Sequence, residues 1–366
     1  MSQQKFLNPN RIWFTIVLLH IAGSVLDAML GILPFGRMIA AIAIWFFLAN
    51  IQEKNVRRIG ICIAGCIITI LMMYSLDISY QGTIILNELL LLYVFWICQN
   101  AYVKPAEYCH LRKVSLKSIF LIIVSAIFLF IMADYVNACS MIAFQNLLDD
   151  SLQAVVNKPI EALVAVAILP AIIEEFLFRG MIYRGIANKS NKQIAIIISA
   201  LLFALLHMNF NQMCYAFVMG LAFAFIIYLT DNLTVSILLH MLFNAFTVIL
   251  TCFEKSNVIQ TILRCNIAGY TLFNPSVINT QGKVEISLLL IGGLIVILSA
   301  IIAGWLILLI VKAEKEKTIE TTINKEAVFK DNNNIFENKE KWKPDLRFFA
   351  GSGLCLLIAI LYEILL

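Results

Sequence analysis

Apolar runs separated by short polar breaks dominate the pattern of this chain. Runs long enough to cross a hydrocarbon core of about 30 Å as a helix recur from Arg11 almost to Leu366. Only helices or closed barrels satisfy their backbone in lipid, and no segment alternates with period two. The pattern therefore predicts an all-α, polytopic integral membrane bundle of about 8–11 transmembrane helices.

The polar breaks place the predicted elements. Helices are expected at 12–33, 36–51, 59–76, 82–99, 116–136, 159–187, 191–208, 212–229, 233–252, 284–311 and 346–366. Ser190 to Gln193 form an S-x-x-Q capping box, and Asp231–Asn232 offer an N-cap before Leu233. The segment 140–156 has apolar positions on one face and is expected to form an amphipathic helix along the membrane surface. The polar stretch 312–345 is expected to be a solvated linker without a chemical role.

Composition supports the membrane class, because 61% of the residues are hydrophobic and 14% are charged, whereas soluble domains have about 45–50% and about 25%. Basic residues concentrate in the segments that share a side with the N-terminus, which predicts a cytoplasmic N-terminus. Of the nine cysteines, only Cys252 and Cys265 flank a polar loop and form a candidate disulfide. No motif supports nucleic-acid binding, and no Cys cluster has metal-site spacing.

Ionisable side chains within spanning helices are costly and are functional candidates by default. Most of those in this chain have structural explanations. Asp27, Asp134 and Glu363 are isolated or near helix ends, and Asn87–Glu88 can bond across a bundle. His20 is similar, and His110 lies among basic residues of a loop.

The segment 169–180 differs, because it places two adjacent carboxylates and an arginine in one apolar helix. Glu175 and Arg179 are four residues apart and share a face, so a bidentate ion pair is expected. Glu174 points about 100° away and is available for another partner. Taken alone, this segment also fits a salt bridge at a helix end.

Two further polar pairs follow on the next helices, at Phe203–His207 and His240–Asn244, again with a separation of four that stacks each pair on one helix face. From the expected helix ends, Glu174, His207 and His240 would lie roughly 20, 25 and 12 Å deep at about 1.5 Å per residue. They can share a site only through helix tilt or a break. Pro170 and Gly180 are suitable positions for such a break.

At these residues the sequence resembles the family of type II CAAX prenyl endopeptidases and bacteriocin-processing enzymes, the CPBP or Abi intramembrane proteases. The three family motifs Glu-Glu-x-x-x-Arg, Phe-x-x-x-His and His-x-x-x-Asn occur in order at Glu174–Arg179, Phe203–His207 and His240–Asn244. The resemblance covers residues 155–255, which are expected to form a catalytic helical core. The apolar pattern adds N-terminal transmembrane helices and the surface amphipathic helix at 1–154, and a remainder at 256–366 with a polar loop, a further transmembrane helix, the charged linker and a C-terminal helix.

By that resemblance, the site residues are Glu174, Glu175, Arg179, His207, His240 and Asn244. Glu174 and His207 would activate a water molecule that attacks a peptide carbonyl, and His240 with Asn244 would stabilise the oxyanion. Glu175 and Arg179 would support Glu174. An older view of the family makes Glu174, His207 and His240 ligands of a catalytic zinc. We favour a metal-independent mechanism without a cofactor and retain zinc as the alternative.

The expected activity is cleavage of a membrane-associated peptide or protein tail in a bacterial plasma membrane, with the lipid bilayer as the second partner. Whether the substrate is prenylated is left open. A transporter or channel is the main alternative, because buried Glu, Arg and His also mark ion pathways. A non-catalytic bacteriocin-immunity scaffold that keeps the fold is the other alternative.

Overall fold

The computed structural model describes residues 7–30, 103–145, 157–278, 282–323 and 341–365. The predicted helices at 36–51, 59–76 and 82–99 lie outside these residues, as does most of the predicted surface helix. Within the described ranges, the chain is almost entirely helical. Five of the described helices are long and apolar enough to cross a membrane, so the prediction of a polytopic helical membrane bundle is confirmed.

The longer helices, apart from the end of α16, follow the predicted ranges closely. They are α1 (Pro9–Leu30), α7 (Leu116–Ser140), α12 (Lys192–Leu206), α13 (Phe210–Thr230), α14 (Leu233–Cys252), α16 (Ile286–Ile323) and α17 (Leu346–Leu365). Shorter elements are α6 (Pro105–Tyr108), α15 (Asn257–Leu263) and an antiparallel pair of two-residue strands, β1 (Asn266–Ile267) and β2 (Tyr270–Thr271).

The predicted helix 159–187 is a single helical run, without a break at Pro170 or Gly180. It comprises α9 (Pro159–Ala162), η2 (Leu163–Ile168), α10 (Leu169–Glu174), η3 (Glu175–Tyr183) and α11 (Arg184–Ala187), and the two η segments are π-helical. π-helical turns widen a helix without ending it and often occur at functional sites. Of the two ways in which the sequence allowed the site residues to meet, tilt or a break, a break is absent from this run.

Polar side chains set the starts of the central helices. Asn232 accepts a hydrogen bond from the Thr234 amide at the start of α14, as predicted. At α12 the cap is Asn191, whose side chain accepts from the Gln193 amide, rather than the expected Ser190. An asparagine carbonyl satisfies the free amides of a first turn as well as a hydroxyl does.

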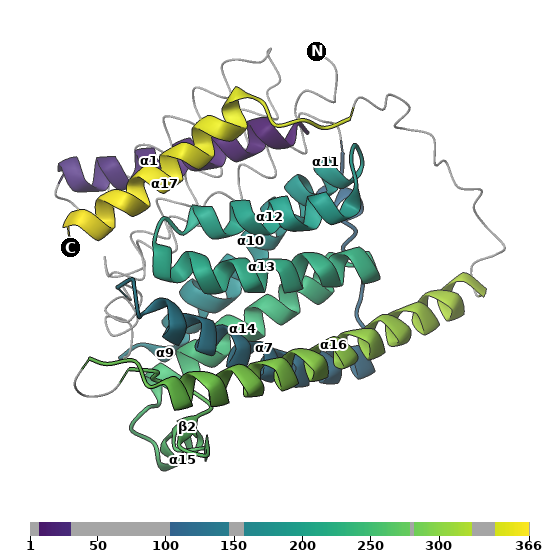
Figure 1. Cartoon of the computed structure of the whole chain (residues 1–366). Helices are drawn as coiled ribbons and strands as arrows, with labels where there is room; N and C mark the ends of the chain where they lie inside the picture. The colour runs from purple at the N-terminus through teal and green to yellow at the C-terminus, as the bar shows by residue number, and fades with distance from the viewer. Residues whose placement is uncertain (1–6, 31–102, 146–156, 279–281, 324–340, 366) are drawn as a thin grey trace.

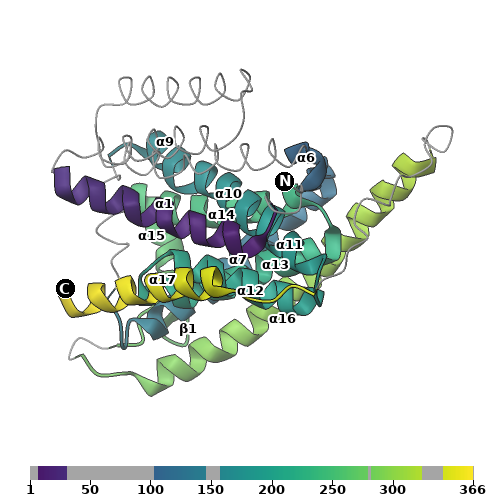
Figure 2. The ribbon, with the colours of Figure 1, turned by 90° about the horizontal axis from the view of Figure 1, so that it is seen from above.

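Figures 1 and 2 show how the helices are layered. α12 and α13 lie side by side at the centre, α1 packs with α17 on one side, and α7 packs with α16 on the other. α14 lies against α7, α13 and the π-helical run. The run 159–187 is therefore enclosed by α1, α12, α13 and α14, which explains why η3 is buried throughout.

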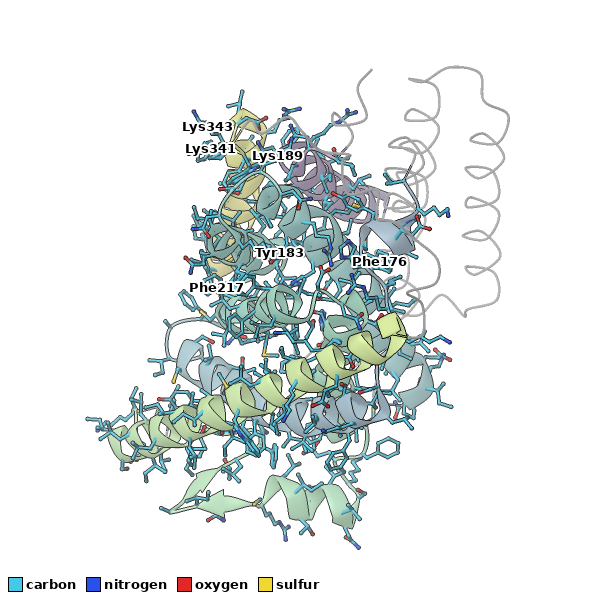
Figure 3. All side chains as sticks on the ribbon, turned by 90° about the vertical axis from the view of Figure 1, so that its right-hand side faces the viewer. Phe176, Tyr183, Lys189, Phe217, Lys341 and Lys343 are labelled. Carbon is cyan, nitrogen blue, oxygen red and sulfur yellow. The ribbon has the colours of Figure 1, made fainter. Side chains whose placement is uncertain are left out.

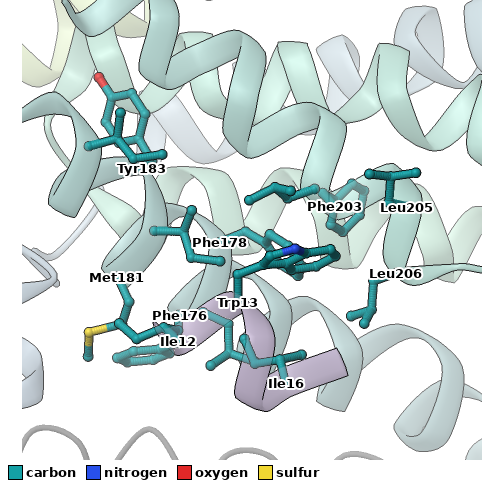
Figure 4. Close-up of a cluster of buried hydrophobic side chains, with 14 of the residues drawn as sticks. Ile12, Trp13, Ile16, Phe176, Phe178, Met181, Tyr183, Phe203, Leu205 and Leu206 are labelled. Atoms are coloured by element: carbon teal, nitrogen blue, oxygen red, sulfur yellow. The ribbon is translucent and has the colours of Figure 1, made fainter. Parts of the chain in front are cut away.

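Two apolar clusters fill the spaces between these layers. The first joins α1, η3, α12 and α17, and Figure 4 shows Trp13 beside Phe178 and Phe203 within it. The Trp13 and Phe178 ring centroids are 6.4 Å apart, and those of Phe178 and Phe203 are 5.3 Å apart. The second cluster joins α7, α13, α14 and α16 around Phe130 and Phe243. Both clusters meet at the centre, where the polar residues lie.

The segment 341–345 attaches α17 to the rest of the bundle. The Trp342 amide donates to the Lys189 carbonyl oxygen, its indole donates to Asn10 Oδ1, and Asn10 Nδ2 donates to the Lys343 carbonyl. Figure 3 shows Lys189, Lys341 and Lys343 gathered at this end of the molecule. The start of α1, the turn before α12 and the start of α17 are thus joined.

Three sequence expectations need correction. α7 ends at Ser140 and residues 141–145 form turns, so the predicted surface helix does not begin at Ser140. α16 continues to Ile323, well into the expected linker, because its Lys, Glu and Ala residues are good helix formers. Cys252 and Cys265 are both free thiols, so the candidate disulfide is absent.

Candidate active site

Glu175 and Arg179 form a buried ion pair at the centre of the bundle. Arg179 Nη1 donates to Glu175 Oε1 at 2.8 Å, and both side chains are fully buried. Nη2 donates instead to the Gly220 carbonyl oxygen at 3.0 Å. The expected pair is therefore present, but it is not bidentate, because the second guanidinium nitrogen ties η3 to α13.

Aromatic rings enclose the guanidinium. Arg179 Cζ lies 4.5 Å from the Phe203 ring centroid and 5.3 Å from that of Phe223. Ring faces attract a cation, most strongly where water is excluded. The two rings offset part of the free-energy cost of burying Arg179 Nε, which has no hydrogen-bond partner among the described residues. The phenylalanine of the Phe-x-x-x-His motif thus contacts the arginine of the first motif.

His240 lies between the two carboxylates. Its Nδ1 is 3.1 Å from Glu175 Oε1, and its Nε2 is 3.7 Å from Glu174 Oε2. Phe223 stacks on the imidazole at 4.7 Å between centroids, and Phe203 meets it edge-on at 5.8 Å. The Glu174 side chain keeps 19% of its surface exposed, so among these carboxylates it is the one that water can reach.

Asn244 lies one turn beyond His240 on the same face of α14. Its Nδ2 donates to the Val166 carbonyl at 3.0 Å and lies 3.2 Å from His240 Nε2. Val166 lies in the π-helical segment η2, where a carbonyl accepts from the residue five positions on. Pro170, four positions on, has no N–H, so the donor of an α-helical turn is missing at the carbonyl that Asn244 uses.

His207 ends α12 and is partly buried. Its Nδ1 lies 2.9 Å from the Phe203 carbonyl oxygen, and its ring meets the Phe203 ring edge-on at 5.1 Å. Since a carbonyl can only accept, Nδ1 carries the hydrogen and Nε2 has a free lone pair when the ring is neutral. No hydrogen bond or ion pair between His207 and Glu174 is present in the described part of the chain.

Ser236 is a member of this cluster that the sequence analysis did not identify. It is fully buried on α14, and its Oγ donates to Glu175 Oε2 at 2.6 Å. Its spacing of four residues before His240 repeats the spacing from His240 to Asn244. That repeated spacing on one helix face was the available signal, but serine is too common in membrane helices to stand out by itself.

A second polar network lies at the turn between α13 and α14. Asp231 accepts from Arg184 Nη1 at 2.7 Å and from Arg112 Nη2 at 3.1 Å, and it lies 2.6 Å from His110 Nδ1. Burial alone would raise the pKa of Asp231, but hydrogen bonds from His110 and Arg184 and their charges hold it well below its usual range. His110, interpreted from sequence as a loop residue, is thus part of an ionic network.

Glu314 belongs to the same end of the bundle, within the stretch expected to lack a role. It is 7% exposed, and it accepts from the Ser115 amide at 3.1 Å and from Asn232 Nδ2 at 3.3 Å. The helical continuation of α16 therefore connects the starts of α7 and α14.

The zinc alternative requires three ligands that converge on one point at about 2.0–2.2 Å. Within the described residues, no group of three or more His, Cys, Asp or Glu side chains is placed to hold a metal ion. Glu174 and His240 approach each other, but the His240 Nε2 faces the Asn244 amide. The proposed ligand set of Glu174, His207 and His240 does not fit zinc in this arrangement, and we derive no step through a metal.

Of the six residues singled out by sequence, five form one connected cluster: Glu174, Glu175, Arg179, His240 and Asn244. His207 joins them through the shared ring of Phe203. Arg179 compensates the charge of Glu175 directly. Within the described part of the chain, Glu174 has no cationic partner in hydrogen-bonding distance.

Comparison with known proteins supports the resemblance inferred from the motifs. The family model described as "Type II CAAX prenyl endopeptidase Rce1-like" matches residues 156–246, which contain all three motifs. The resemblance to this membrane endopeptidase family is thereby confirmed for that part of the chain. No solved structure matches the chain.

Two curated bacterial proteins are similar to part of the chain. The membrane-embedded CAAX protease MroQ of Staphylococcus aureus (strain USA300) is 34% identical over 116 residues, which are 30% of this chain and 47% of MroQ. The provisionally named membrane peptidase YdiL of Bacillus subtilis (strain 168) is 33% identical over 101 residues, which are 28% of this chain and 40% of YdiL. The chain thus spans less than half the length of both relatives.

Proposed function

We propose that this protein is an intramembrane endopeptidase that hydrolyses a peptide bond in a membrane-associated peptide or protein tail. One observation carries the proposal. The partly exposed carboxylate of Glu174 lies 3.7 Å from a buried histidine that is itself bound to a second, fully buried carboxylate. This cluster lies inside the segment that matches an endopeptidase family.

Glu174 and His207 would activate the water. Glu174 can act as the general base, because its carboxylate is partly exposed and lies beside His240. The free Nε2 lone pair of neutral His207 can accept a second hydrogen bond from the same water. The water oxygen would then attack the peptide carbonyl while Glu174 takes its proton.

His240 and Asn244 would stabilise the oxyanion. Both lie on one face of α14 and are held by partners on the run 159–187, so their positions are fixed before charge develops. Preorganised donors in a site that excludes water commonly contribute a factor of about 10²–10³ to kcat. Glu175 and Arg179 would form an ion pair that supports His240 and Asn244 and would not touch the substrate.

The substrate class follows from the location of the site among membrane-crossing helices. A peptide that reaches Glu174 must enter from lipid or from the membrane surface, which favours a lipid-attached or amphipathic segment. One relative is named a CAAX protease. A prenylated C-terminal tail is therefore the first candidate, and an unmodified amphipathic peptide is the second.

Purified protein in lipid vesicles tests the proposal. It would be incubated with two synthetic peptides of identical sequence, one farnesylated at a C-terminal Cys-aliphatic-aliphatic-X motif and one unmodified, and the products would be identified by mass spectrometry. Wild-type protein should cleave at least one peptide, and Glu174→Gln and His207→Ala should not, while both variants keep the wild-type melting temperature. Full activity in either variant would refute the mechanism.

The same preparation separates the alternatives. Zinc-specific recovery after chelation would replace metal-independent water activation with the zinc mechanism. A transporter should instead carry protons or ions across the vesicle membrane, and Glu174→Gln should abolish that flux. A non-catalytic immunity scaffold should show neither cleavage nor flux in the wild-type protein.

A further inference from the structure

Ser236 is the only hydroxyl in contact with the carboxylate pair among the described residues. It lies on α14 one turn before His240, and its side chain is fully buried. Its Oγ has two acceptors within reach, Glu175 Oε2 at 2.6 Å and the Phe223 carbonyl at 3.4 Å. The shorter contact ends on the carboxylate, so the hydroxyl hydrogen is directed to Glu175.

The two oxygens of Glu175 have separate partners. Oε1 accepts from Arg179 Nη1 at 2.8 Å and lies 3.1 Å from His240 Nδ1, whereas Oε2 accepts from Ser236. Together these contacts fix the plane of the carboxylate. Without the hydroxyl, Oε2 would be buried without a donor, and the carboxylate could rotate away from the imidazole.

These contacts decide which imidazole nitrogen carries the hydrogen. An ionised carboxylate only accepts, and its arginine partner is permanently charged, so His240 Nδ1 must donate to Glu175. On the other side, Asn244 Nδ2 donates to the Val166 carbonyl at 3.0 Å, which sets the orientation of the amide. That nitrogen also faces His240 Nε2 at 3.2 Å, so Nε2 is the acceptor.

We infer that Ser236 is a positioning residue that, through Glu175, holds His240 in the Nδ1–H tautomer, so that Nε2 begins each reaction cycle as a proton acceptor. The inference deepens the proposed function and rests on it for its chemical consequence. Phe223 supports the same arrangement, because its ring stacks on the imidazole at an interplanar angle of 23°.

This tautomer of His240 sets the order in which protons are transferred. Neutral His240 cannot donate from Nε2 to an oxyanion, so its donor role begins only after it gains a proton. Glu174 removes a proton from water as the water oxygen bonds to the carbonyl carbon and the C=O π electrons move to oxygen. The proton passes from Glu174 to His240 Nε2, which lies 3.7 Å from Glu174 Oε2, as Nε2 leaves its contact with Asn244 Nδ2. The imidazolium then donates it to the departing nitrogen as the C–N bond breaks, which leaves an acid, an amine and neutral His240.

Nitrogen-15 NMR of histidine-labelled protein tests the tautomer directly, because the chain has only four histidines. Single His→Gln substitutions assign the signals. In the wild type, the His240 signals should be those of a neutral ring protonated at Nδ1. In Ser236→Ala, the signals should shift towards a mixture of both tautomers, and Ser236→Thr, which restores the hydroxyl, should recover the wild-type pattern.

Ser125→Ala is the matched control. Ser125 is equally buried, but its hydroxyl donates to the Leu121 carbonyl of its own helix and reaches no ionised group. It should leave the His240 signals unchanged. On a peptide that the wild type cleaves, Ser236→Ala should lower kcat about 10-fold with little change in KM, as expected for lost support of a reacting side chain, and Ser125→Ala should not.

Two results would overturn the inference. One is a neutral His240 that is protonated at Nε2 in the wild type. That measurement does not depend on whether a Ser236 variant folds. The other is a Ser236→Ala protein that keeps both the wild-type tautomer and the wild-type kcat. The first result needs no substrate at all. Absence of peptide cleavage would refute the proposed function, whereas the tautomer assignment would still stand on the NMR signals.

Discussion

The carbonyl oxygen of Gly220 accepts a hydrogen bond from Arg179 Nη2 at 3.0 Å, so the backbone of α13 is bound to the helical run that carries both carboxylates. The same glycine lies at a close approach of α12 and α13. A Cβ at position 220 would lie 3.0 Å from the Ala200 Cα and 3.2 Å from its carbonyl oxygen. Two backbones therefore meet directly beside the candidate site.

Gly220→Ala should accordingly destabilise the protein by about 1–3 kcal/mol, because backbone atoms cannot move aside as flexible side chains can. Thermal unfolding in detergent measures this. Gly304→Ala, on α16, is the control, since nothing lies within 4 Å of its added Cβ. It should be neutral or stabilising by about 0.5–1 kcal/mol through helix propensity. Equal effects of the two substitutions would contradict the close approach.

Arg179→Ala should lower stability by about 3–5 kcal/mol, because it leaves the Glu175 charge buried without its partner. Arg179→Lys restores a cation but supplies one compact head group instead of two divergent nitrogens, so it should recover only part of this loss. Urea or thermal unfolding in detergent would rank the three proteins. If Arg179→Ala were as stable as the wild type, the pair would not be the buried support described above.

Pro170→Ala should separate stability from activity. The substitution supplies an N–H that lets the π-helical turn at Val166 tighten to an α-helical turn, in which residue 170 donates to the Val166 carbonyl in competition with Asn244 Nδ2. We expect equal or higher thermal stability together with a lower rate of peptide cleavage. Pro159→Ala is the control, because proline at the first turn of α9 replaces an amide that has no helical acceptor. Unchanged cleavage in Pro170→Ala would show that the freed carbonyl is unimportant to Asn244.

Asp231→Asn should cost about 1 kcal/mol at neutral pH, a modest value because the side chain is 48% exposed. Since the folded-state pKa of Asp231 is depressed, its contribution is complete above the unfolded pKa of about 3.9 and declines as the pH falls below that value. Wild-type and variant melting temperatures should therefore converge in acid. A difference in melting temperature between the two proteins that stays constant from pH 7 down to acid would contradict the ionic role of Asp231.

Much of the fold could be predicted because lipid imposes a length on every apolar run. The ranges of α7, α12, α13, α14 and α17 follow directly from polar breaks and caps. The extension of α16 to Ile323 could not, because Lys and Glu suit both a helix and a solvated linker. The anchor for that extension, Glu314, depends on a serine amide about 200 residues away in sequence.

The candidate site was only partly predictable for a related reason. Spacing of four along one helix identified Glu175 with Arg179 and His240 with Asn244, since such pairs are neighbours in any helix. Contacts between helices, such as Ser236 with Glu175 or Asn244 with Val166, depend on helix rotation and on the π-helical turns. No local sequence pattern predicts a π-helical turn. The level along the helices at which Glu174 approaches His240 therefore could not be derived from the sequence.

The packing of α17 on α1 also constrains how the molecule can be assembled. A Cβ at Gly351 would lie 2.8 Å from Trp13 Nε1, and the bond from Asn10 to Lys343 joins residues 333 positions apart. At synthesis rates of about 5–20 residues per second, the helix that covers Trp13 is made roughly 15–70 s after Trp13 itself. During that interval the indole must face lipid, another helix or a chaperone. Maturation of the bundle therefore ends late, with the arrival of α17.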